Sequence, residues 1–398
     1  MHTGAASSKK GFIAGTHRTR SPAETFDDYK RWMPTMGITR VANITGLDVI
    51  GLPVYTAIRP NARSLSTSQG KGIDDASAKT SALMESIEFW HAEHIDDARL
   101  RWDTCARMRR SASIVDLLAL ALRDSVAGDA PLLWIEGFCL LTGRATWVPF
   151  DLVTQCDLAV GGVPVTPLGC SSTGLASGNH VLEAISHALC EIVERHCDVS
   201  WAFANQGVRI DPASITDGIA AAVLSMLRDA GVYACIWDCT DPAIGVPSFA
   251  CNVLDAPDAG RRRLLGFYSG SGCHLSAEVA LARALTEAVQ SRLTYIAGSR
   301  DDIFRGQYGS TQNESVHRLQ WDELHREKDL RSFAPVSLAA ETFGEDVERL
   351  LRACERAGAK QAIVVDLTRR EMEIPVVKVI VPGMREMGVG ALQPQEIR

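Results

Sequence analysis

The 398-residue sequence lacks three features that would each point to a class of protein. No segment approaches the roughly 18 consecutive apolar residues of a membrane-spanning helix. No long basic run offsets the net charge of −7, so a nucleic-acid partner has no electrostatic support, and any bound cation is expected to be a metal. The first residues carry two lysines but no apolar core behind them, unlike a secretory signal, and we therefore expect a cytoplasmic protein.

The interior also lacks a proline-rich or serine-rich linker, which favours one large domain over two. We predict a flexible tail at residues 1–13 and a single domain at residues 14–398. The eleven cysteines are scattered and odd in number, which predicts reduced thiols rather than disulfides. The pairs Cys190/Cys197 and Cys235/Cys239 have no matching second pair at zinc-ligand spacing, so we predict no zinc site.

Apolar periodicity predicts a mixed α/β chain of the α+β class. Apolar, β-branched residues between glycines and prolines predict two or three strands in residues 38–60 and hairpins at 131–150 and 247–271. Strands are expected at 232–238, 361–367 and 374–380. Helical spacing predicts helices at 74–95, 113–124, 180–205, 218–231, 276–297 and 343–357.

One pattern occurs three times in register. Residues 78–88 (AKTSALMESIE), 184–194 (AISHALCEIVE) and 280–290 (ALARALTEAVQ) all fit A-x-x-x-A-L-x-E-x-x-[E/Q]. Alanines four residues apart give each helix a small face on which another element can pack closely. The acidic positions, three apart, point to one side of each helix. They are Glu85 and Glu88, Glu191 and Glu194, and Glu287, which has the neutral Gln290 three residues after it.

A glycine-rich segment, which we expect to be a loop, precedes each of these helices: SQGKG at 68–72, SSTGLASGN at 171–179 and SGSGC at 269–273. Glycine loops before helix N-termini bind anions, and carboxylates hold the Mg²⁺ that accompanies phosphate. Basic residues beside the segments would contact phosphate or offset the carboxylates. They are Lys71, Arg195, Arg283 and Arg292. A single acidic pair is usually a solvated helix surface, but three copies among apolar neighbours favour a polyphosphate site with magnesium.

The same blocks resemble those of YcaO proteins, the ATP-dependent activators of peptide backbone amides. The segments are SQGKGIDDASAKTSALMESIEFWHAE, STGLASGNHVLEAISHALCEIVERH and GCHLSAEVALARALTEAVQSRLTYIAGSRDD, and the likeness covers roughly residues 14–385. The run from GTHRTRSPAET to GITRVANITGLDVIGLPVYTAIRPNARS is similar to the subgroup found with TfuA-type partner proteins. The resemblance implies mixed sheets flanked by helices, three acidic helices around an ATP site, and a homodimer.

Carried over by position, the resemblance implies ATP and Mg²⁺ as cofactors and assigns the following residues. Magnesium ligands would be Glu85, Glu88, Glu191, Glu194 and Glu287, with Glu191, Glu194 and Arg195 carrying the catalysis. Nucleotide contacts would be Asn179, Glu183 and Arg195, helped by Lys71, Ser81, Arg283, Gln290 and Arg292, with Arg18 and Thr25 near the N-terminus. Phe89 stands where the family often has arginine.

An amide oxygen is a poor leaving group, and converting it to phosphate makes its replacement possible. The TfuA-like N-terminal block favours a thioamide product in a ribosomally made peptide, with a TfuA-like partner protein and a sulfide donor. The chain ends in GVGALQPQEIR, with one proline, whereas azoline-forming members commonly end in a proline-rich tail. Azoline formation on Cys, Ser or Thr of a precursor peptide is the alternative. A nucleotide-binding partner subunit without catalysis is the alternative from another class.

Overall fold

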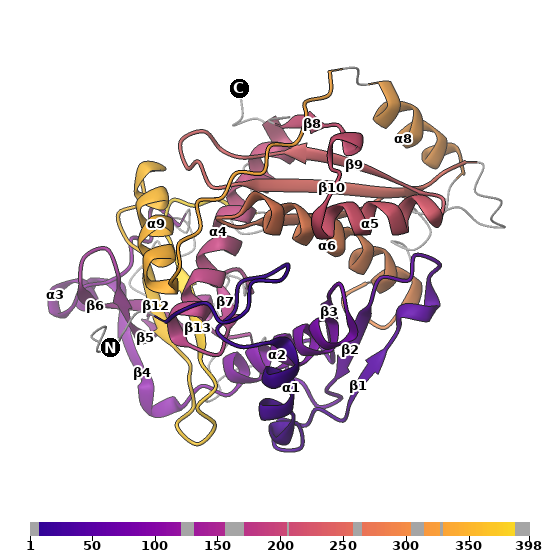
Figure 1. Ribbon diagram of the computed structural model, residues 1–398. Helices are drawn as coiled ribbons and strands as arrows, with labels where there is room; N and C mark the ends of the chain where they lie inside the picture. Colours follow the sequence, from indigo (N-terminus) through magenta and orange to yellow (C-terminus); the bar gives the residue numbers. More distant parts are fainter. Residues whose placement is uncertain are drawn as a thin grey trace.

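The computed structural model describes residues 8–120, 131–155, 171–204, 207–257, 265–303, 314–326 and 329–386. As predicted, these residues form an α+β fold of sheets flanked by helices (Figure 1). Their strands form three sheets in which neighbouring strands are antiparallel. No helix in this part of the chain is long and apolar enough to cross a membrane. The cysteines at its described positions are free and buried.

The first sheet is a three-stranded meander covered by two helices. It has the order β1-β2-β3, and α2 packs on it while α1 packs on α2. The bounds are α1 Pro22–Tyr29, β1 Arg40–Asn43, β2 Val54–Ile58, β3 Thr67–Lys71 and α2 Asp75–Glu93. The strands predicted in 38–60 and the helix predicted at 74–95 are therefore confirmed.

The second sheet has the order β11-β10-β9-β8, with α5 and α6 packed on it. Its core holds the apolar residues of β9 and β10 against the alanine-rich face of α6. The bounds are β8 Val208–Ile210, α5 Gly218–Asp229, β9 Val232–Asp238, β10 Ser248–Asp255, β11 Tyr268–Cys273 and α6 Ala277–Ala297. The predicted hairpin at 247–271 is β10 and β11, which pair in antiparallel register.

The third sheet has the order β4-β5-β12-β13-β7, with β6 beside β5, and α4 and α9 pack with its inner strands in one core. The bounds are β4 Leu100–Thr104, α3 Cys105–Ser111, β5 Pro131–Cys139, β6 Arg144–Pro149, β7 Leu175–Ser177, α4 Val181–Ala204, α9 Phe343–Arg356, β12 Ile363–Asp366 and β13 Val376–Ile380. A further helix, α8, spans Glu314–Arg326.

Each acidic helix directly follows a strand at the edge of a sheet. The three strand-helix units are β3-α2, β7-α4 and β11-α6, one from each sheet. The three helices surround the centre of the molecule, and the N-terminal segment crosses between them (Figure 1). Edge strands carry backbone groups that no neighbouring strand satisfies, and here these groups face the helices that bear the glutamates.

Two of the segments predicted as glycine loops are strands, and this prediction was wrong. SQGKG lies largely in β3 and SGSGC in β11. Glycine is required because the helix of the same unit packs directly on the strand. A Cβ at Gly70 would lie 2.0 Å from the backbone nitrogen of Ala82, and one at Gly272 would lie 2.1 Å from the carbonyl oxygen of Ala280. The glycines of the strand and the alanines of the helix thus lie on the two facing surfaces of one close helix-on-strand contact.

Two other expectations also differ from the structure. The described residues of the predicted helix at 113–124, namely 113–120, form no helix, because Val115 donates to the carbonyl of Trp147 at 2.9 Å along the edge of β6. Residues 121–124 lie outside the described residues. Of the predicted tail, residues 8–12 pack beside α9, where Lys10 Nζ lies 2.5 Å from Asp346. Residues 1–7 lie outside the described residues.

Candidate active site

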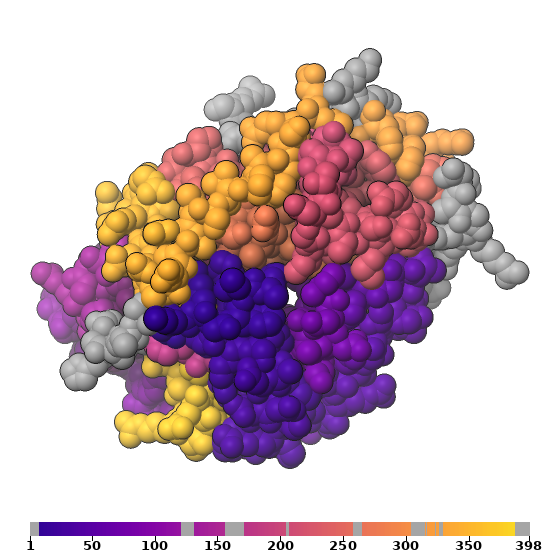
Figure 2. All heavy atoms as spheres, viewed as in Figure 1, coloured from indigo at the N-terminus to yellow at the C-terminus, as the bar shows by residue number. Residues whose placement is uncertain are grey.

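The three acidic helices line one cavity of about 720 Å³. Its walls come from α2, α4 and α6, from the edge strands before them, and from the N-terminal segment up to α1. The space-filling view shows a narrow hollow where the indigo N-terminal segment meets the purple and rose parts of the chain (Figure 2). One cavity therefore collects side chains from all three repeats.

The first glutamate of each repeat accepts a hydrogen bond from the strand segment of its own unit. In the first and third units the donor is the equivalent strand residue, so the local geometry repeats along with the sequence. The three bonds run from the N–H of Gln69 to Glu85 at 2.6 Å, of Gly174 to Glu191 at 3.0 Å, and of Ser271 to Glu287 at 3.4 Å.

The second acidic position of each repeat bonds to the edge strand of the next unit, so the three units close into a ring. The bonds run from Ser177 N–H to Glu88 at 2.8 Å, from Cys273 N–H to Glu194 at 2.9 Å, and from Gln290 Nε2 to the Gln69 carbonyl at 3.3 Å. In the third unit the strand presents an acceptor, and the glutamine found there can donate to it whereas a carboxylate could not. We call the five acidic members the carboxylate ring: Glu85, Glu88, Glu191, Glu194 and Glu287.

Burial disfavours the charged form of most of the ring. It raises the pKa of Glu85 to about 7 and, with the help of Glu85, that of Glu88 to about 8. Burial also raises the pKa of Glu191 and Glu194. Glu287 differs: burial acts in the same direction, but Lys71 and Arg195 together hold its pKa below the ordinary value. Full ionisation of the ring is therefore costly, because its protein neighbours offset the negative charge only in part.

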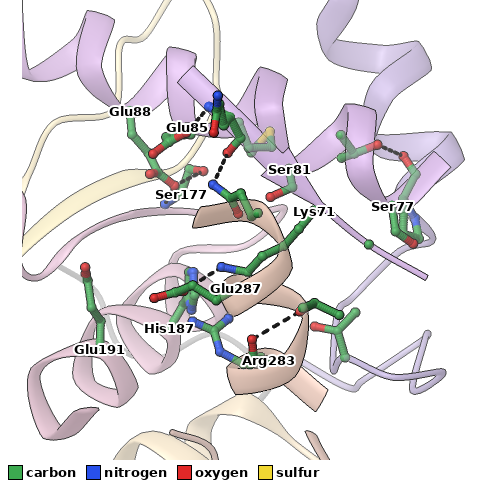
Figure 3. Close-up of a pocket in the computed structure, with 18 of the residues that line it drawn as sticks. Lys71, Ser77, Ser81, Glu85, Glu88, Ser177, His187, Glu191, Arg283 and Glu287 are labelled. Carbon is green, nitrogen blue, oxygen red and sulfur yellow. Dashed lines mark hydrogen bonds and ion pairs between the residues drawn. The ribbon is translucent and has the colours of Figure 1, made fainter. Parts of the chain in front are cut away.

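Three basic side chains face the ring. Lys71 Nζ lies 2.6 Å from Glu287, and Arg283 lies 3.8 Å from Glu194. Arg195 stands between Glu191 at 3.8 Å and Asp198, the latter 3.9 Å away. Burial would lower the pKa of Arg195, but the surrounding carboxylates raise it, so the guanidinium stays charged. Figure 3 shows Glu85 and Glu88 across the cavity from Glu287 and Lys71, while Glu191 projects from a third helix.

The donor set fits magnesium that arrives with phosphate rather than a metal held by protein alone. Within the described residues, no three His, Cys, Asp or Glu side chains converge as a ready-made metal cluster. Glu85, Glu88 and Glu194 each use one carboxylate oxygen in the ring bonds, which leaves the other for a cation. Because Mg²⁺ takes one or two carboxylates and completes its shell with water and phosphate oxygens, spaced carboxylates suit it.

The N-terminal segment forms one end of the cavity. Thr25 donates to Asn179 Oδ1 at 3.0 Å, and Arg18 lies 3.4 Å from Glu183. Glu183, with a side chain only 1% exposed, also accepts the backbone N–H of Thr19 at 2.9 Å. Its carboxylate therefore fixes the N-terminal segment against α4, so its predicted nucleotide contact would have to share these bonds.

The predicted residues other than Arg292 line the cavity. Arg292 is buried on another side of α6, where it lies 2.8 Å from Asp48 and 3.0 Å from Asp255. Arg292 therefore does not share the cavity with the other residues predicted to contact the nucleotide, because it follows Gln290 by two residues and side chains so spaced do not share a helix face.

Several cavity residues escaped prediction because they lie outside the acidic positions of the repeat. Arg20 donates to Asn179 Oδ1 at 2.8 Å. His187, one turn before Glu191, lines the cavity as a neutral imidazole, since burial and Arg283 lower its pKa. Arg300 lines the cavity from the loop after α6. The Ser-Arg-Asp-Asp run at 299–302 was the available signal for Arg300.

Comparisons with known proteins agree with this architecture. The family described as YcaO cyclodehydratase, ATP- and Mg²⁺-binding, matches residues 69–385. An uncharacterized protein in the tfuA 3′ region of Rhizobium leguminosarum bv. trifolii is 36% identical over 382 residues, covering 92% of this chain and 88% of the relative. An uncharacterized protein of Methanothermobacter thermautotrophicus is 33% identical over 383 residues, with 92% and 95% covered.

Two solved structures share the fold. YcaO from Methanopyrus kandleri, bound with AMPPCP and Mg²⁺, matches with a TM-score of 0.72 at 20% identity, covering 95% of each chain. A heterocyclase in complex with substrate and cofactor matches with a TM-score of 0.76 at 21% identity. That match covers 96% of this chain and 54% of the heterocyclase, so the chain spans about half of its length.

Proposed function

Because the chain belongs to the YcaO family, we propose that it uses ATP and Mg²⁺ to phosphorylate the oxygen of a peptide backbone amide, and that the product is a thioamide. The observation that carries this proposal is the carboxylate ring. It brings anionic oxygens from three helices into one cavity beside Lys71, Arg195 and Arg283. Such a cavity suits a polyphosphate with bound Mg²⁺, because the carboxylates can bind the metal and the basic side chains can bind the phosphate oxygens.

The ring residues are proposed to hold magnesium. Bound Mg²⁺ would neutralise the phosphate oxygens and the charge that develops during transfer. The backbone N–H groups that orient Glu85, Glu88 and Glu194 fix these carboxylates before the cation arrives. That preorganisation lowers the cost of assembling the site.

The nucleotide is proposed to lie between the ring and the N-terminal segment. Asn179, Thr25 and Arg18 form the far wall of that space, with Ser81 and Gln290 along the helices. Arg283 and Lys71 would exchange their carboxylate partners for phosphate oxygens when ATP binds. Arg195, held between two carboxylates, would stay in place and face the transferred group.

The proposed reaction converts the amide to a thioamide in three steps. A sulfur nucleophile adds to the amide carbon, and the carbonyl oxygen gains the electron pair as an oxyanion. That oxygen attacks the γ-phosphorus of ATP, and ADP leaves. The carbon–oxygen bond then breaks, inorganic phosphate departs with the former amide oxygen, and the carbon–sulfur double bond forms with loss of the sulfur proton.

The thioamide assignment is supported by the relative in the tfuA 3′ region, which shares 36% of aligned residues over 92% of this chain. A TfuA-like protein is proposed as the partner that helps deliver sulfide. Formation of an azoline ring would use the same amide activation, with a side chain of the peptide as the nucleophile in place of sulfide.

Mass spectrometry of a peptide treated with the protein, ATP, Mg²⁺, sulfide and a TfuA-like protein tests the proposal. Exchange of oxygen for sulfur adds about 16 Da, whereas ring closure by an internal nucleophile removes about 18 Da. The first result supports thioamidation, and the second replaces it with azoline formation. Folded protein that turns over no ATP in any combination would indicate a nucleotide-binding subunit without catalysis.

A further inference from the structure

The cavity continues past the carboxylate ring, away from the N-terminal segment. Its lining runs along α2 from Ser77 to Phe89 and along α6 from Ala282 to Tyr295. These stretches cover about 18 and 20 Å of helix, since an α-helix rises about 1.5 Å per residue. The cavity thus has two ends with the ring between them. We call the end at the C-terminal halves of α2 and α6 the distal end.

Part of the wall of the distal end is apolar, beside the polar side chains of Gln69, Ser291 and Thr294. Leu65, Phe89, Tyr295 and Ile303 line the apolar part, and Phe89 is 8% exposed. Phe89 directly follows the acidic pair of the first repeat, the position that Arg195 occupies in the second. Both of these positions line the cavity, so the first repeat presents an aromatic ring where the second presents a guanidinium.

The wall around Leu65 is fixed on both sides. The N–H of Ser64 donates to Glu93 at 3.1 Å, and the N–H of Ser66 donates to Asp301 at 2.9 Å. Glu93 is itself anchored by Arg59 at 2.5 and 2.7 Å. The loop before β3 and the loop after α6 are therefore joined into one rigid edge.

One guanidinium faces the distal end. Arg300 Nε and one terminal nitrogen donate to the two oxygens of Asp302 at 2.8 and 2.5 Å, and both residues line the cavity. The fork of bonds sets the plane of the guanidinium and leaves its other edge free to donate. Asp302 offsets part of the charge of Arg300, and the remaining charge acts on Glu85, where it opposes the rise in pKa that burial causes.

The position of the carboxylate ring indicates which reactant enters the distal end. In the proposed function the γ-phosphate lies at the carboxylates and the rest of the nucleotide lies toward Asn179. An oxygen that attacks phosphorus in line with the departing ADP must approach from the opposite side. That side is the distal end.

We propose that the distal end binds an internal, uncharged segment of the peptide substrate. Arg300 donates to a backbone carbonyl oxygen next to the reacting amide, and the apolar walls around Phe89 receive an apolar side chain of the peptide. This inference rests on the proposed function, because it takes a peptide amide as the group that is phosphorylated.

Photocrosslinking from the distal end tests the inference. Ile303 is replaced by p-benzoylphenylalanine, and the probe is a pool of N-acetylated, C-amidated pentapeptides with leucine or phenylalanine at the centre. We expect peptide crosslinks that increase when AMPPCP and Mg²⁺ are present. In this background Arg300→Gln should lower the yield by roughly 10-fold to 100-fold, the loss expected for one hydrogen bond from a charged donor. Arg300→Lys, which retains charge but not the fork, should give an intermediate yield.

The control is Arg352→Gln, an exposed arginine on α9 whose substitution should leave the yield unchanged. Thermal unfolding of each variant separates a lost contact from a lost fold. Suppression of the crosslink by adenosine would place the base at the distal end and overturn the inference, as would an unchanged yield for folded Arg300→Gln. Calorimetry with AMPPCP and Mg²⁺ separates the two claims. Absent nucleotide binding defeats the proposed function, whereas normal binding without peptide crosslinks defeats only this inference.

Discussion

Replacement of Glu191 by glutamine removes one charge from the carboxylate ring and almost no volume. Glu191 accepts the N–H of Gly174 at 3.0 Å, and the amide oxygen of glutamine can keep that bond. The pKa of Glu191 is raised by burial and by Glu194, so the charge is already costly to the folded protein. Because a like-charged pair on one helix face costs about 0.2–0.5 kcal/mol, we expect the free energy of unfolding to be unchanged or slightly higher.

Activity should respond in the opposite direction. Loss of one preorganised group at a site of phosphoryl transfer costs about 100-fold to 1,000-fold in kcat, and we expect a loss of this size for Glu191→Gln together with a higher Mg²⁺ requirement. The assay is ADP release at saturating ATP across a magnesium titration, with urea unfolding in parallel. Glu348→Gln is the control, because its carboxylate on α9 is 69% exposed and distant from the ring. Turnover by folded Glu191→Gln within about threefold of the parent protein would refute the role of this carboxylate.

Three further predictions concern stability. Arg292→Gln should lower the free energy of unfolding in urea by about 3–5 kcal/mol, because it removes the cation between two buried aspartates. The AMPPCP affinity of the folded variant should equal that of the parent protein. Gly272→Ala should prevent stable folding or lower the melting temperature sharply, since its Cβ would meet the α6 backbone at 2.1 Å, whereas Gly46→Ala, with nothing within 4 Å, should have little effect in the same thermal scan. Without magnesium, stability should fall between about pH 5 and pH 8. Folded-state pKa values of about 7 for Glu85 and about 8 for Glu88 exceed the unfolded value, so their stabilisation is complete at low pH and lost as they ionise. Added Mg²⁺ and AMPPCP should make the free energy of unfolding depend less steeply on pH. An equal slope with and without them would contradict the role of Glu85 and Glu88 as magnesium ligands.

Much of the secondary structure follows from local periodicity. The long helices were predicted because their apolar residues keep one spacing over many positions, and both hairpins because apolar runs lie between glycines and prolines. The predicted helix is absent from residues 113–120 because of a tertiary contact. Ile114 forms a bridge to Trp147 and Val115 bonds to the same residue, so these residues extend along β6 instead of coiling.

The glycine segments show where a local signal has two meanings. Glycine beside a helix start is typical of an anion-binding loop, but Gly70 and Gly272 lie in strands because a helix backbone occupies the space a side chain would need. The glycines alone do not tell a strand from a loop. That distinction requires pairing them with the alanines of the helix that packs on the strand.

The ring itself was predictable from the threefold pattern, but its closure was not. The hydrogen bonds that Ser177 N–H donates to Glu88 and Cys273 N–H donates to Glu194 connect units far apart in the chain. Arg20 and Arg300 belong to segments without periodicity, so only the folded chain brings them to the cavity.

Transfer of the amide oxygen to phosphate is the central claim, and isotope labelling tests it most directly. A substrate peptide carrying ¹⁸O at the reacting carbonyl is incubated with the protein, ATP, Mg²⁺, sulfide and a TfuA-like protein, and the released phosphate is analysed by mass spectrometry. The account predicts that each phosphate formed with product carries the label and is heavier by about 2 Da. Product formed together with unlabelled phosphate would contradict it.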